Sequence, residues 1–281
     1  MTSERKSVQA VSHLRAASGG EAAGGALGAP GAPGAPVAPV APVAPVVPVA
    51  PGAPQGGVGI HRLVFEANHM FVDLPEGRFL VDTGSPLSFG TTGTATYGGV
   101  TTQIPRTMLG IGMEVFDGLP GVRCDGLLGM DILGPRTVLW DGPRGVAIVG
   151  DDAVDPSAVR VPMRSLLGVP VVEGRIGGRD AACIFDTGAQ YGYVLDESLV
   201  DGGEEDGELS DYNPVTGPIH SKAWRMSVDL GGVRFPERMG HLDGSAAAML
   251  GTFGVEAIIG CSWLASRRVW FAPGQSLLAV A

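Results

Sequence analysis

Short apolar runs separated by glycine-rich segments cover the chain from Val58 to its end. Residues 61–74 alternate loosely between apolar and polar positions and predict one or two strands, and residues 169–176 predict another. The 3.6-residue spacing of an amphipathic helix is scarce in the chain. The hydrophobic pattern therefore predicts a mainly β protein.

Turn sequences between apolar runs predict two hairpins. Residues 137–140 and 146–149 flank a turn that contains glycine and proline, and residues 268–271 and 276–280 flank a second one. Residues 85–115 are rich in threonine and glycine and predict irregular strands and loops.

Two further local features lie between these strands. The acidic run within residues 202–208 predicts a solvated loop. Asp131 is placed to cap the N-terminus of a short helix, and Ser262 occupies the corresponding position later in the chain.

The tripeptide Asp-Thr-Gly occurs twice, at residues 82–84 and 186–188, each time after a short apolar run. Farther along, each copy is followed by two aliphatic residues and a glycine, at residues 127–129 and 258–260. The same order of features in both halves predicts an internal duplication of a unit of about 100 residues. The length that remains after the first 57 residues suits two small domains or one bilobal domain, and the duplication places two pseudo-symmetric lobes at residues 58–152 and 160–281.

The N-terminal 57 residues have a different composition. Proline occupies every third position from Pro30 to Pro54, which removes the amide donors that a membrane-spanning helix needs. Glycine does not recur at every third position, so the stretch is not collagen-like. We predict a disordered arm over residues 1–57, with a polyproline II spacer at residues 30–54 that acts as a tether.

The net charge and the cysteine content limit the classes of binding partner and the cellular compartments that we expect for this protein. The formal net charge of −10 argues against nucleic acid and anionic membrane surfaces. Cys124, Cys183 and Cys261 have no paired spacing, so we expect small buried side chains and no disulfide framework. No apolar stretch of the kind found in secretion signals follows Arg5 and Lys6, and we expect a cytoplasmic protein without a membrane span.

Each half of the chain places an aspartate at the end of a predicted buried strand. Two such aspartates could face each other as a pair of acids. If the two lobes meet about a twofold axis, Asp82 and Asp186 come within hydrogen-bonding distance. Two like charges at that distance cannot both ionise, so the pair shares one proton. One carboxylate then acts as a base toward water while the other protonates a substrate carbonyl. This chemistry needs no metal or other cofactor, and the five histidines show no metal-binding spacing.

The motif of two apolar residues, Asp-Thr-Gly and Ser or Ala, followed later by an aliphatic pair, a glycine and a helix, resembles the aspartic peptidases of the pepsin and retropepsin families. The resemblance covers residues 60–281, and the second copy, which ends in Ala189, is closer to retropepsin-like proteins. It implies two acid-protease-type β-barrel lobes with a cleft between them, and cleavage of an extended peptide bound in the cleft.

The resemblance also implies roles for individual residues. Asp82 and Asp186 would be the catalytic pair, and the hydroxyl groups of Thr83 and Thr187 would each reach across to the other lobe. Ser85 would hydrogen-bond the outer oxygen of Asp82.

The remaining positions of the two loops are small residues. Gly84 and Gly188 would let backbone amides approach the carboxyl oxygens closely. Ala189 cannot supply the hydroxyl contact that Ser85 would make in the first loop.

Aspartic peptidases also cover the cleft with a β-hairpin flap. Residues 212–232 resemble such a hairpin with its returning strand, with Tyr212 near its base. The first lobe has less sequence between its aspartate and its aliphatic pair, so a flap there would be short or missing. This differs from pepsin-like enzymes, in which the flap belongs to the first lobe.

We therefore expect an aspartic endopeptidase that acts on a peptide or protein substrate as a monomer with intramolecular lobe pairing. One alternative is a catalytically silent peptide-binding module of the same fold, tethered through the proline-rich arm. Another is a protein in which lobes pair between chains instead of within one.

Overall fold

The computed structural model describes residues 58–116, 123–150, 153–213 and 217–281, all within one structural unit, Ala50–Ala281. The predicted disordered arm, residues 1–57, and its polyproline II stretch lie outside the described residues. In the described ranges β-strands dominate and helices are short, so the prediction of a mainly β protein is confirmed.

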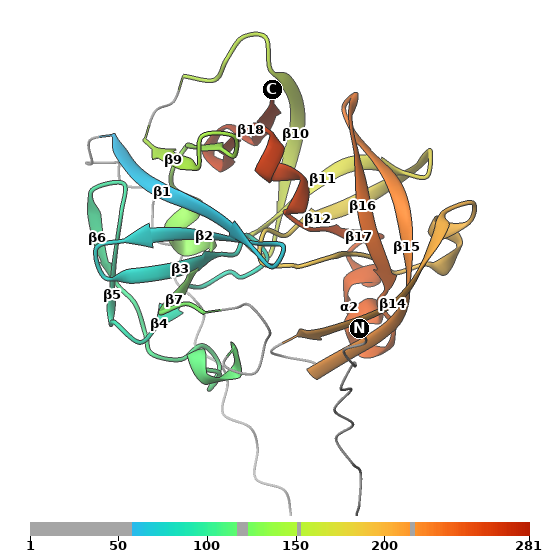
Figure 1. Ribbon diagram of the computed structural model, residues 1–281, viewed down its shortest axis with the longest axis horizontal. Coiled ribbons are helices and arrows are strands. Elements are labelled where there is room, and N and C mark those ends of the chain that lie inside the picture. Colours follow the sequence, from blue (N-terminus) through green and yellow to red (C-terminus); the bar gives the residue numbers. More distant parts are fainter. Residues whose placement is uncertain (1–57, 117–122, 151–152, 214–216) are drawn as a thin grey trace, which may run out of the picture. The chain divides into compact units, whose positions relative to one another are not determined.

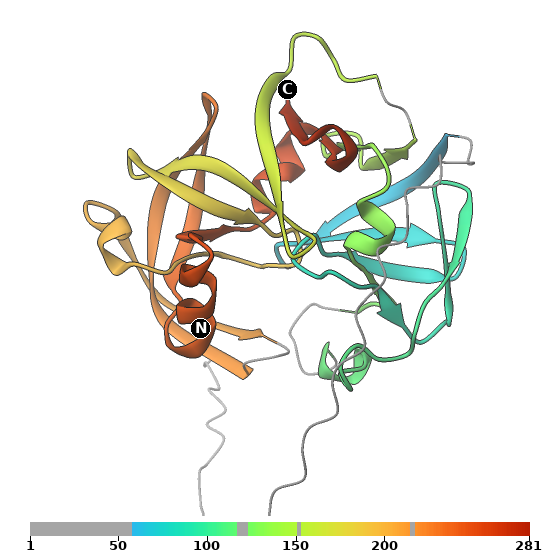
Figure 2. The same ribbon diagram turned by 180° about the vertical axis from the view of Figure 1, so that it is seen from behind.

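Two β-rich lobes lie side by side in this unit (Figures 1 and 2). We call the lobe that contains Asp82 the first lobe and the lobe that contains Asp186 the second lobe. The strands are β1 (Gly59–Glu66), β2 (His69–Leu74), β3 (Gly77–Val81), β4 (Phe89–Gly90), β5 (Thr94–Tyr97), β6 (Val100–Gln103), β7 (Gly126–Leu128), β8 (Val138–Asp141), β9 (Val146–Val149), β10 (Val159–Leu166), β11 (Val169–Ile176), β12 (Arg179–Phe185), β13 (Gly192–Val194), β14 (Glu204–Asn213), β15 (Gly217–Leu230), β16 (Val233–His241), β17 (Ala257–Ile259), β18 (Arg268–Ala272) and β19 (Leu277–Val280). The α-helices are α1 (Met130–Leu133) and α2 (Gly244–Thr252), and the 3-10 helices are Met113–Phe116, Glu197–Val200, Ser262–Ser266 and Pro273–Gln275.

The first lobe begins with three consecutive antiparallel strands. Strand β2 pairs with β1 and β3, and β1 also pairs with β9. The chain reverses between β1 and β2 at Ala67 and Asn68, which have φ angles of 50° and 58°. The alternating stretch 61–74 therefore forms two strands, because two successive left-handed residues break the extended backbone.

A parallel pair leads into each Asp-Thr-Gly loop. Strand β3 pairs in parallel with β7, with Val81 opposite Leu128. In the second lobe β12 pairs in parallel with β17, with Phe185 opposite Ile259. In both lobes the strand that ends at the aspartate thus lies directly beside the strand that carries the aliphatic pair.

The rest of the second lobe is a long meander. Strands β14, β15 and β16 pair antiparallel in sequence, and β16 pairs in parallel with β13. Strand β13 also pairs antiparallel with β17. The β14–β15 hairpin therefore belongs to the same sheet as β12, the strand that leads to Asp186.

The two predicted hairpins join the lobes. Strands β8 and β9 form one hairpin and β18 and β19 form the other, so both predictions are confirmed. Strand β18 then pairs with β8, with Val269 opposite Trp140, and β19 pairs with β10. The pairing order β9, β8, β18, β19 and β10 therefore forms a continuous run of strands that connects the lobes.

Aromatic side chains fill the core beneath this sheet. Trp140 of β8 stacks on Phe271 of β18 with ring centroids 5.1 Å apart, and both lie near Phe185. Trp263 stacks on Phe235 at 4.4 Å and also contacts Phe185. Because large buried rings pack tightly, this cluster holds the residue that precedes Asp186 in a fixed position.

The acidic run predicted to be a solvated loop instead belongs to a strand. Glu204 to Glu208 lie in β14, with Glu204 opposite Arg225 of β15. Asp206 makes ion pairs of 3.3 Å with Arg225 and Arg238. The prediction of a loop was wrong, because the run pairs with β15, but Glu204, Glu205 and Glu208 are exposed to solvent as predicted.

Both predicted helix caps are also wrong. Helix α1 begins at Met130 with Gly129 at the N-cap position, and Asp131 Oδ1 instead accepts hydrogen bonds from the amide and hydroxyl of Ser88. Ser262 is the first residue of a 3-10 helix, and its hydroxyl donates to Glu237. In each case the side chain hydrogen-bonds a buried polar residue elsewhere in the same lobe and does not cap the helix.

Cys183 and Cys261 are buried, as predicted, whereas Cys124 is only partly buried. No helix in the described part of the chain has the length and apolar character needed to cross a bilayer.

Candidate active site

Each Asp-Thr-Gly loop is anchored at its aspartate by the neighbouring aliphatic strand. The amide of Asp82 donates to Leu128 O at 3.0 Å, and the amide of Asp186 donates to Ile259 O at 2.9 Å. The aliphatic pairs are therefore fixed against the two loops by backbone hydrogen bonds.

The threonines of the two loops exchange four hydrogen bonds between the lobes. Thr83 Oγ1 donates to Phe185 O at 2.6 Å, and Thr187 Oγ1 donates to Val81 O at 2.7 Å. Each hydroxyl also accepts the amide of the other threonine at 3.0 Å. Both threonines are fully buried. The loops meet within a single chain, and their relative position is set by bonds that water cannot replace.

Glycine is required at the third position of each loop. A Cβ atom at Gly84 would lie 2.3 Å from Asp186 Oδ2, and one at Gly188 would lie 2.4 Å from Asp82 Cγ. Any side chain at either position would collide with the opposing carboxyl group. The backbone of each loop thus lies directly against the aspartate of the other.

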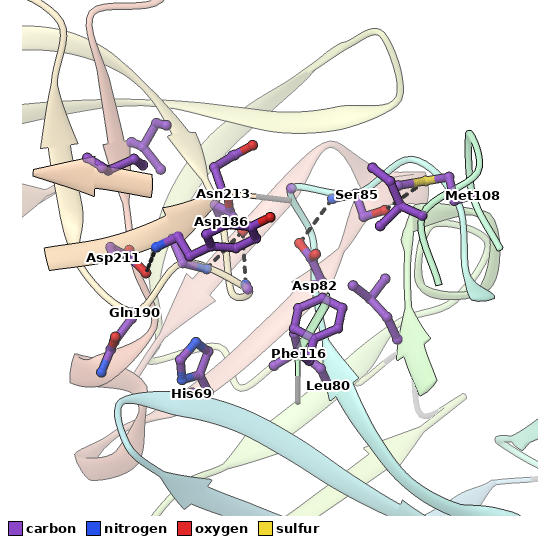
Figure 3. Close-up of a pocket in the computed structure, with 18 of the residues that line it drawn as sticks. His69, Leu80, Asp82, Ser85, Met108, Phe116, Asp186, Gln190, Asp211 and Asn213 are labelled. Carbon is purple, nitrogen blue, oxygen red and sulfur yellow. Dashed lines mark hydrogen bonds between the residues drawn. The ribbon is translucent and has the colours of Figure 1, made fainter. Parts of the chain in front are cut away.

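The two carboxyl groups lie close enough to interact electrostatically, and each accepts hydrogen bonds from backbone amides (Figure 3). Asp82 Oδ1 accepts the amide of Ser85 at 3.0 Å, and Asp186 Oδ1 accepts the amides of Gly188 and Ala189 at 2.9 and 3.2 Å. Both side chains are partly exposed. Water can therefore reach a pair of acids that protein surrounds on most sides.

Burial raises the pKa of both carboxyl groups. For Asp82 the negative charge of Asp186 adds to the effect of burial, and the pKa lies well above its ordinary value. For Asp186 burial raises the pKa, while the hydrogen bonds from Asp82 and the loop amides oppose the rise. The pair therefore favours a state in which one proton lies between the two groups.

Ser85 contacts Asp82 through its backbone only. Its hydroxyl donates to Leu87 O at 2.8 Å and lies 3.6 Å from Met108 Sδ. The predicted hydroxyl contact with Asp82 is not formed, because Leu87 O, two residues along the turn, takes up the donor. The two loops consequently hold their aspartates through the same kind of contact, despite the difference between Ser85 and Ala189.

The carboxyl pair lines a cleft of about 300 Å³ between the lobes. The wall beside Asp82 is apolar, as Figure 3 shows for Leu80 and Phe116. The wall beside Asp186 carries polar groups, including those of His69, Gln190 and Asp211. The site is therefore asymmetric in polarity, although the two loops are nearly symmetric in geometry.

A hairpin of the second lobe borders the cleft. Strands β14 and β15 pair out to Asn213 opposite Gly217, with residues 214–216 outside the described residues. Tyr212 lines the cleft and lies beside the end of this hairpin, not near its base as predicted. The hairpin is longer than predicted, because the acidic run pairs as part of its first strand.

The corresponding hairpin of the first lobe, β5–β6, does not line the cleft. Its Thr96 binds the carboxylate of Glu76 through both the amide and the hydroxyl, and its Tyr97 stacks on His61 at 5.3 Å. These contacts fix the hairpin against the side of the lobe. The 3-10 helix Met113–Phe116 and the segment before it line the cleft instead.

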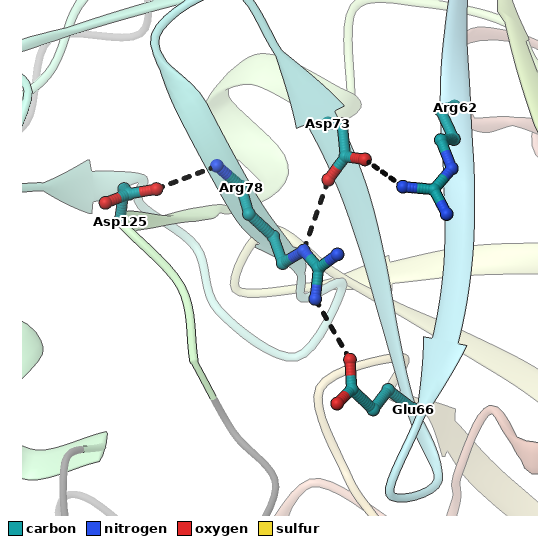
Figure 4. Close-up of polar contacts among 5 residues, drawn as sticks. All are labelled: Arg62, Glu66, Asp73, Arg78 and Asp125. Atoms are coloured by element: carbon teal, nitrogen blue, oxygen red, sulfur yellow. Dashed lines mark hydrogen bonds and ion pairs between the residues drawn. The ribbon is translucent and has the colours of Figure 1, made fainter.

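Arg78 braces the strands that lead to Asp82 (Figure 4). Its side chain donates to Asp73 at 3.2 Å and to Glu66 at 2.9 Å, and its amide donates to Asp125 at 2.9 Å. The network ties β1, β2 and β3 to the residue that precedes β7. It therefore supports the parallel pair beneath the first loop.

The polar residues of the cleft that were not predicted include His69, Gln190, Tyr193 and Asp211. Tyr193 OH donates to Asp211 Oδ2 at 2.6 Å, and Gln190 Nε2 donates to Ala67 O of the other lobe at 3.0 Å. For Gln190, Tyr193 and Asp211 the one available signal was their closeness in sequence to the second Asp-Thr-Gly or to Tyr212. For His69 the sequence contains no such signal, because a histidine at the start of a strand indicates only a core or surface role.

Among the residues that the structure describes, no group of three or more His, Cys, Asp or Glu side chains is arranged to hold a metal ion.

No protein-family model matches the sequence, and no curated protein matches it. Among solved structures, the aspartic proteinase from Irpex lacteus is similar, with a TM-score of 0.47 and 13% sequence identity over 80% of this chain and 97% of that one. A likeness of this size shows no shared activity, so the function has to be inferred from the geometry of the cleft.

The buried carboxyl group of Glu237 lies next to the backbone that packs against the second Asp-Thr-Gly loop. Glu237 of β16 is 2% exposed and accepts a hydrogen bond from Ser262 Oγ at 3.3 Å, together with the amides of Gly192 and Gly260. Gly260 also lies against Ala189, since a Cβ there would be 2.8 Å from Ala189 O. Burial raises the pKa of Glu237 to about 7.

The raised pKa of Glu237 should make the folded state less stable as pH rises. Between pH 4.5, its ordinary pKa, and about 7, the folded protein keeps a proton that the unfolded chain releases. The stabilisation is therefore full below pH 4.5 and is lost toward pH 7. Glu237→Gln should remove about 3 kcal/mol of this change in the free energy of unfolding, measured by urea denaturation across the range. The exposed Glu197→Gln is the control, and equal pH dependence in the two variants would contradict the assignment.

Proposed function

We propose that this protein is an aspartic endopeptidase whose lobes are residues 58–152 and 160–281. The observation that carries the proposal is the close approach of Asp82 and Asp186, each of which lies against the Asp-Thr-Gly loop of the other, at a cleft that both carboxyl groups line. The threonine exchange supports it, because it fixes the two carboxyl groups relative to each other before any substrate binds.

The reaction uses the single proton that the pair retains. The ionised carboxylate removes a proton from water as the water oxygen attacks the peptide carbonyl carbon, and the protonated carboxyl group gives its proton to the carbonyl oxygen. When the tetrahedral intermediate collapses, the carbon–nitrogen bond breaks and a carboxyl proton passes to the leaving nitrogen, while the other carboxylate takes the proton of one hydroxyl group of the intermediate as the carbonyl bond re-forms. The pair ends with one proton and is ready for a second turnover.

The β14–β15 hairpin is the proposed flap. Asp211, Tyr212 and Ile219 of this hairpin line the cleft, so an extended peptide would lie between them and the carboxyl pair. Exclusion of bulk water by the hairpin would strengthen the electrostatic interactions in the site. The flap would come from the second lobe, with the 3-10 helix Met113–Phe116 facing it across the cleft.

Peptide hydrolysis across a range of pH tests the proposal. A diverse peptide library incubated with the protein at pH 3 to 7 should be cleaved, and pepstatin should inhibit the cleavage. Activity should fall at acidic pH as a second proton binds the pair, and at higher pH as the raised pKa of the pair is passed. Peptide binding without cleavage at any pH would instead indicate a silent peptide-binding module.

A further inference from the structure

Asp211 places an uncompensated carboxylate in the cleft. Its Oδ2 accepts the hydroxyl of Tyr193 at 2.6 Å and its Oδ1 accepts the amide of Tyr212 at 2.7 Å. A carboxylate has about four acceptor positions, so capacity remains for further donors. No lysine or arginine of the described ranges lies within ion-pair distance of it.

The other acids of the same hairpin differ from Asp211. Asp206 makes ion pairs with two arginines, and Glu208 is exposed and does not line the cleft. Asp211 therefore combines a partly buried position in the cleft with the absence of a cationic partner among the described residues.

A basic residue that lines the same cleft, His69, does not neutralise Asp211 at neutral pH. His69 lines the same cleft, and its Nδ1 lies 2.9 Å from Ala67 O. Burial lowers the pKa of His69, although the charge of Asp211 opposes the effect. The imidazole is therefore uncharged near neutrality, and the negative charge of Asp211 stays available to a ligand.

The surface next to Asp211 suits an aliphatic chain. Ile219 lies directly opposite Asp211 across the β14–β15 ladder, and Leu242 and Ile258 line the same part of the cleft. Lysine and arginine side chains bury their methylene groups on apolar surfaces while the charged end reaches a polar partner. An apolar surface that ends at a carboxylate could therefore bind a lysine or arginine side chain along its whole length.

We propose that the cleft selects peptides with a lysine or arginine on the second-lobe side of the scissile bond and a large apolar residue on the first-lobe side. The cationic group would bind Asp211, and its methylene chain would lie on Ile219 and Leu242. Leu80 and Phe116 would contact the apolar residue. This assignment rests on the proposed binding of an extended peptide in the cleft.

Binding of uncleavable peptides tests the proposal without relying on turnover. The probes are octapeptides in which a hydroxyethylene group replaces the scissile bond, with leucine on one side and arginine on the other, in both orders. Matched probes carry citrulline, which has nearly the shape of arginine without its charge. By calorimetry near pH 6, arginine should bind about tenfold more tightly than citrulline in one of the two orders.

Two variants separate a charge effect from a change in the hairpin. Asp211→Asn should reduce the ratio of arginine to citrulline affinity to about one, because the two probes differ only in charge. Glu208→Gln, on the same strand and outside the cleft, should keep the ratio of the wild type. A purely structural role of Asp211 would change both affinities together and leave their ratio unaltered.

The outcomes distinguish this inference from the proposed function. Equal affinities for arginine and citrulline in both orders would overturn the selectivity and leave peptide hydrolysis unaffected. A preference that Asp211→Asn abolishes would support the selectivity even if no peptide is cleaved. Failure of all four probes to bind would overturn both the selectivity and the binding of peptides in the cleft.

Discussion

Asp82→Asn should reduce peptide hydrolysis at least about a thousandfold while the protein remains folded. Asparagine has the shape of the protonated carboxyl group and can still accept the amide of Ser85. It cannot exchange protons with water or substrate, so the pair loses one of its two roles. Asp186→Asn should have an effect of the same size, because both roles are needed for each turnover.

Asp180→Asn is the matched control for these variants. Asp180 is an exposed residue near the start of β12 and pairs with Arg175 at 2.8 Å, outside the cleft. Its replacement should leave turnover within a factor of about two, since distant surface changes have small effects. Circular dichroism and urea denaturation should give Asp82→Asn a fold like that of the wild type. Retained turnover in either cleft variant would exclude the shared-proton reaction.

Thr83→Val should lower the free energy of unfolding by about 2 to 6 kcal/mol. Valine keeps the shape of threonine but leaves Phe185 O and the amide of Thr187 without their partner, and both lie between the lobes. An unsatisfied buried polar group costs about 1 to 3 kcal/mol, and the substitution creates two of them. Urea denaturation at constant pH measures the change.

Two further threonine variants make the test specific to the hydroxyl group. Thr83→Ser keeps the hydroxyl and removes one methyl group, so it should cost only about 1 kcal/mol. Thr101→Val changes an exposed residue of β6 and should have an effect within about 0.5 kcal/mol. If Thr83→Val were as stable as Thr83→Ser, the exchange between the lobes would contribute nothing.

The sequence was most informative where function depends on a short local pattern. An apolar run that ends in Asp-Thr-Gly predicts a buried strand that delivers a carboxylate, and the aliphatic pair predicts its neighbour. Both parallel pairs form, with Val81 beside Leu128 and Phe185 beside Ile259. The hairpins at either end of these units were predictable for the same reason, because their turns have distinctive composition.

Features that depend on distant partners were not predictable. The local sequence predicts that Asp131 caps a helix, but its carboxylate instead accepts hydrogen bonds from Ser88, which is far away in sequence. The acidic run lies in a strand because Arg225 and Arg238 compensate Asp206. Asp211 enters the cleft because β14 extends that far, which no periodicity in the run indicated.

The central claim is that Asp82 and Asp186 share one proton, and a carboxyl titration tests it most directly. The protein is labelled with carbon-13 at the aspartate carboxyl groups, and the resonances of the pair are followed by NMR against pH. We expect the two resonances to change together, with the last proton lost well above the ordinary value of 3.8, and Asp82 to titrate at lower pH in Asp186→Asn. Independent titration of both groups near pH 3.8, unchanged in the variant, would contradict the claim.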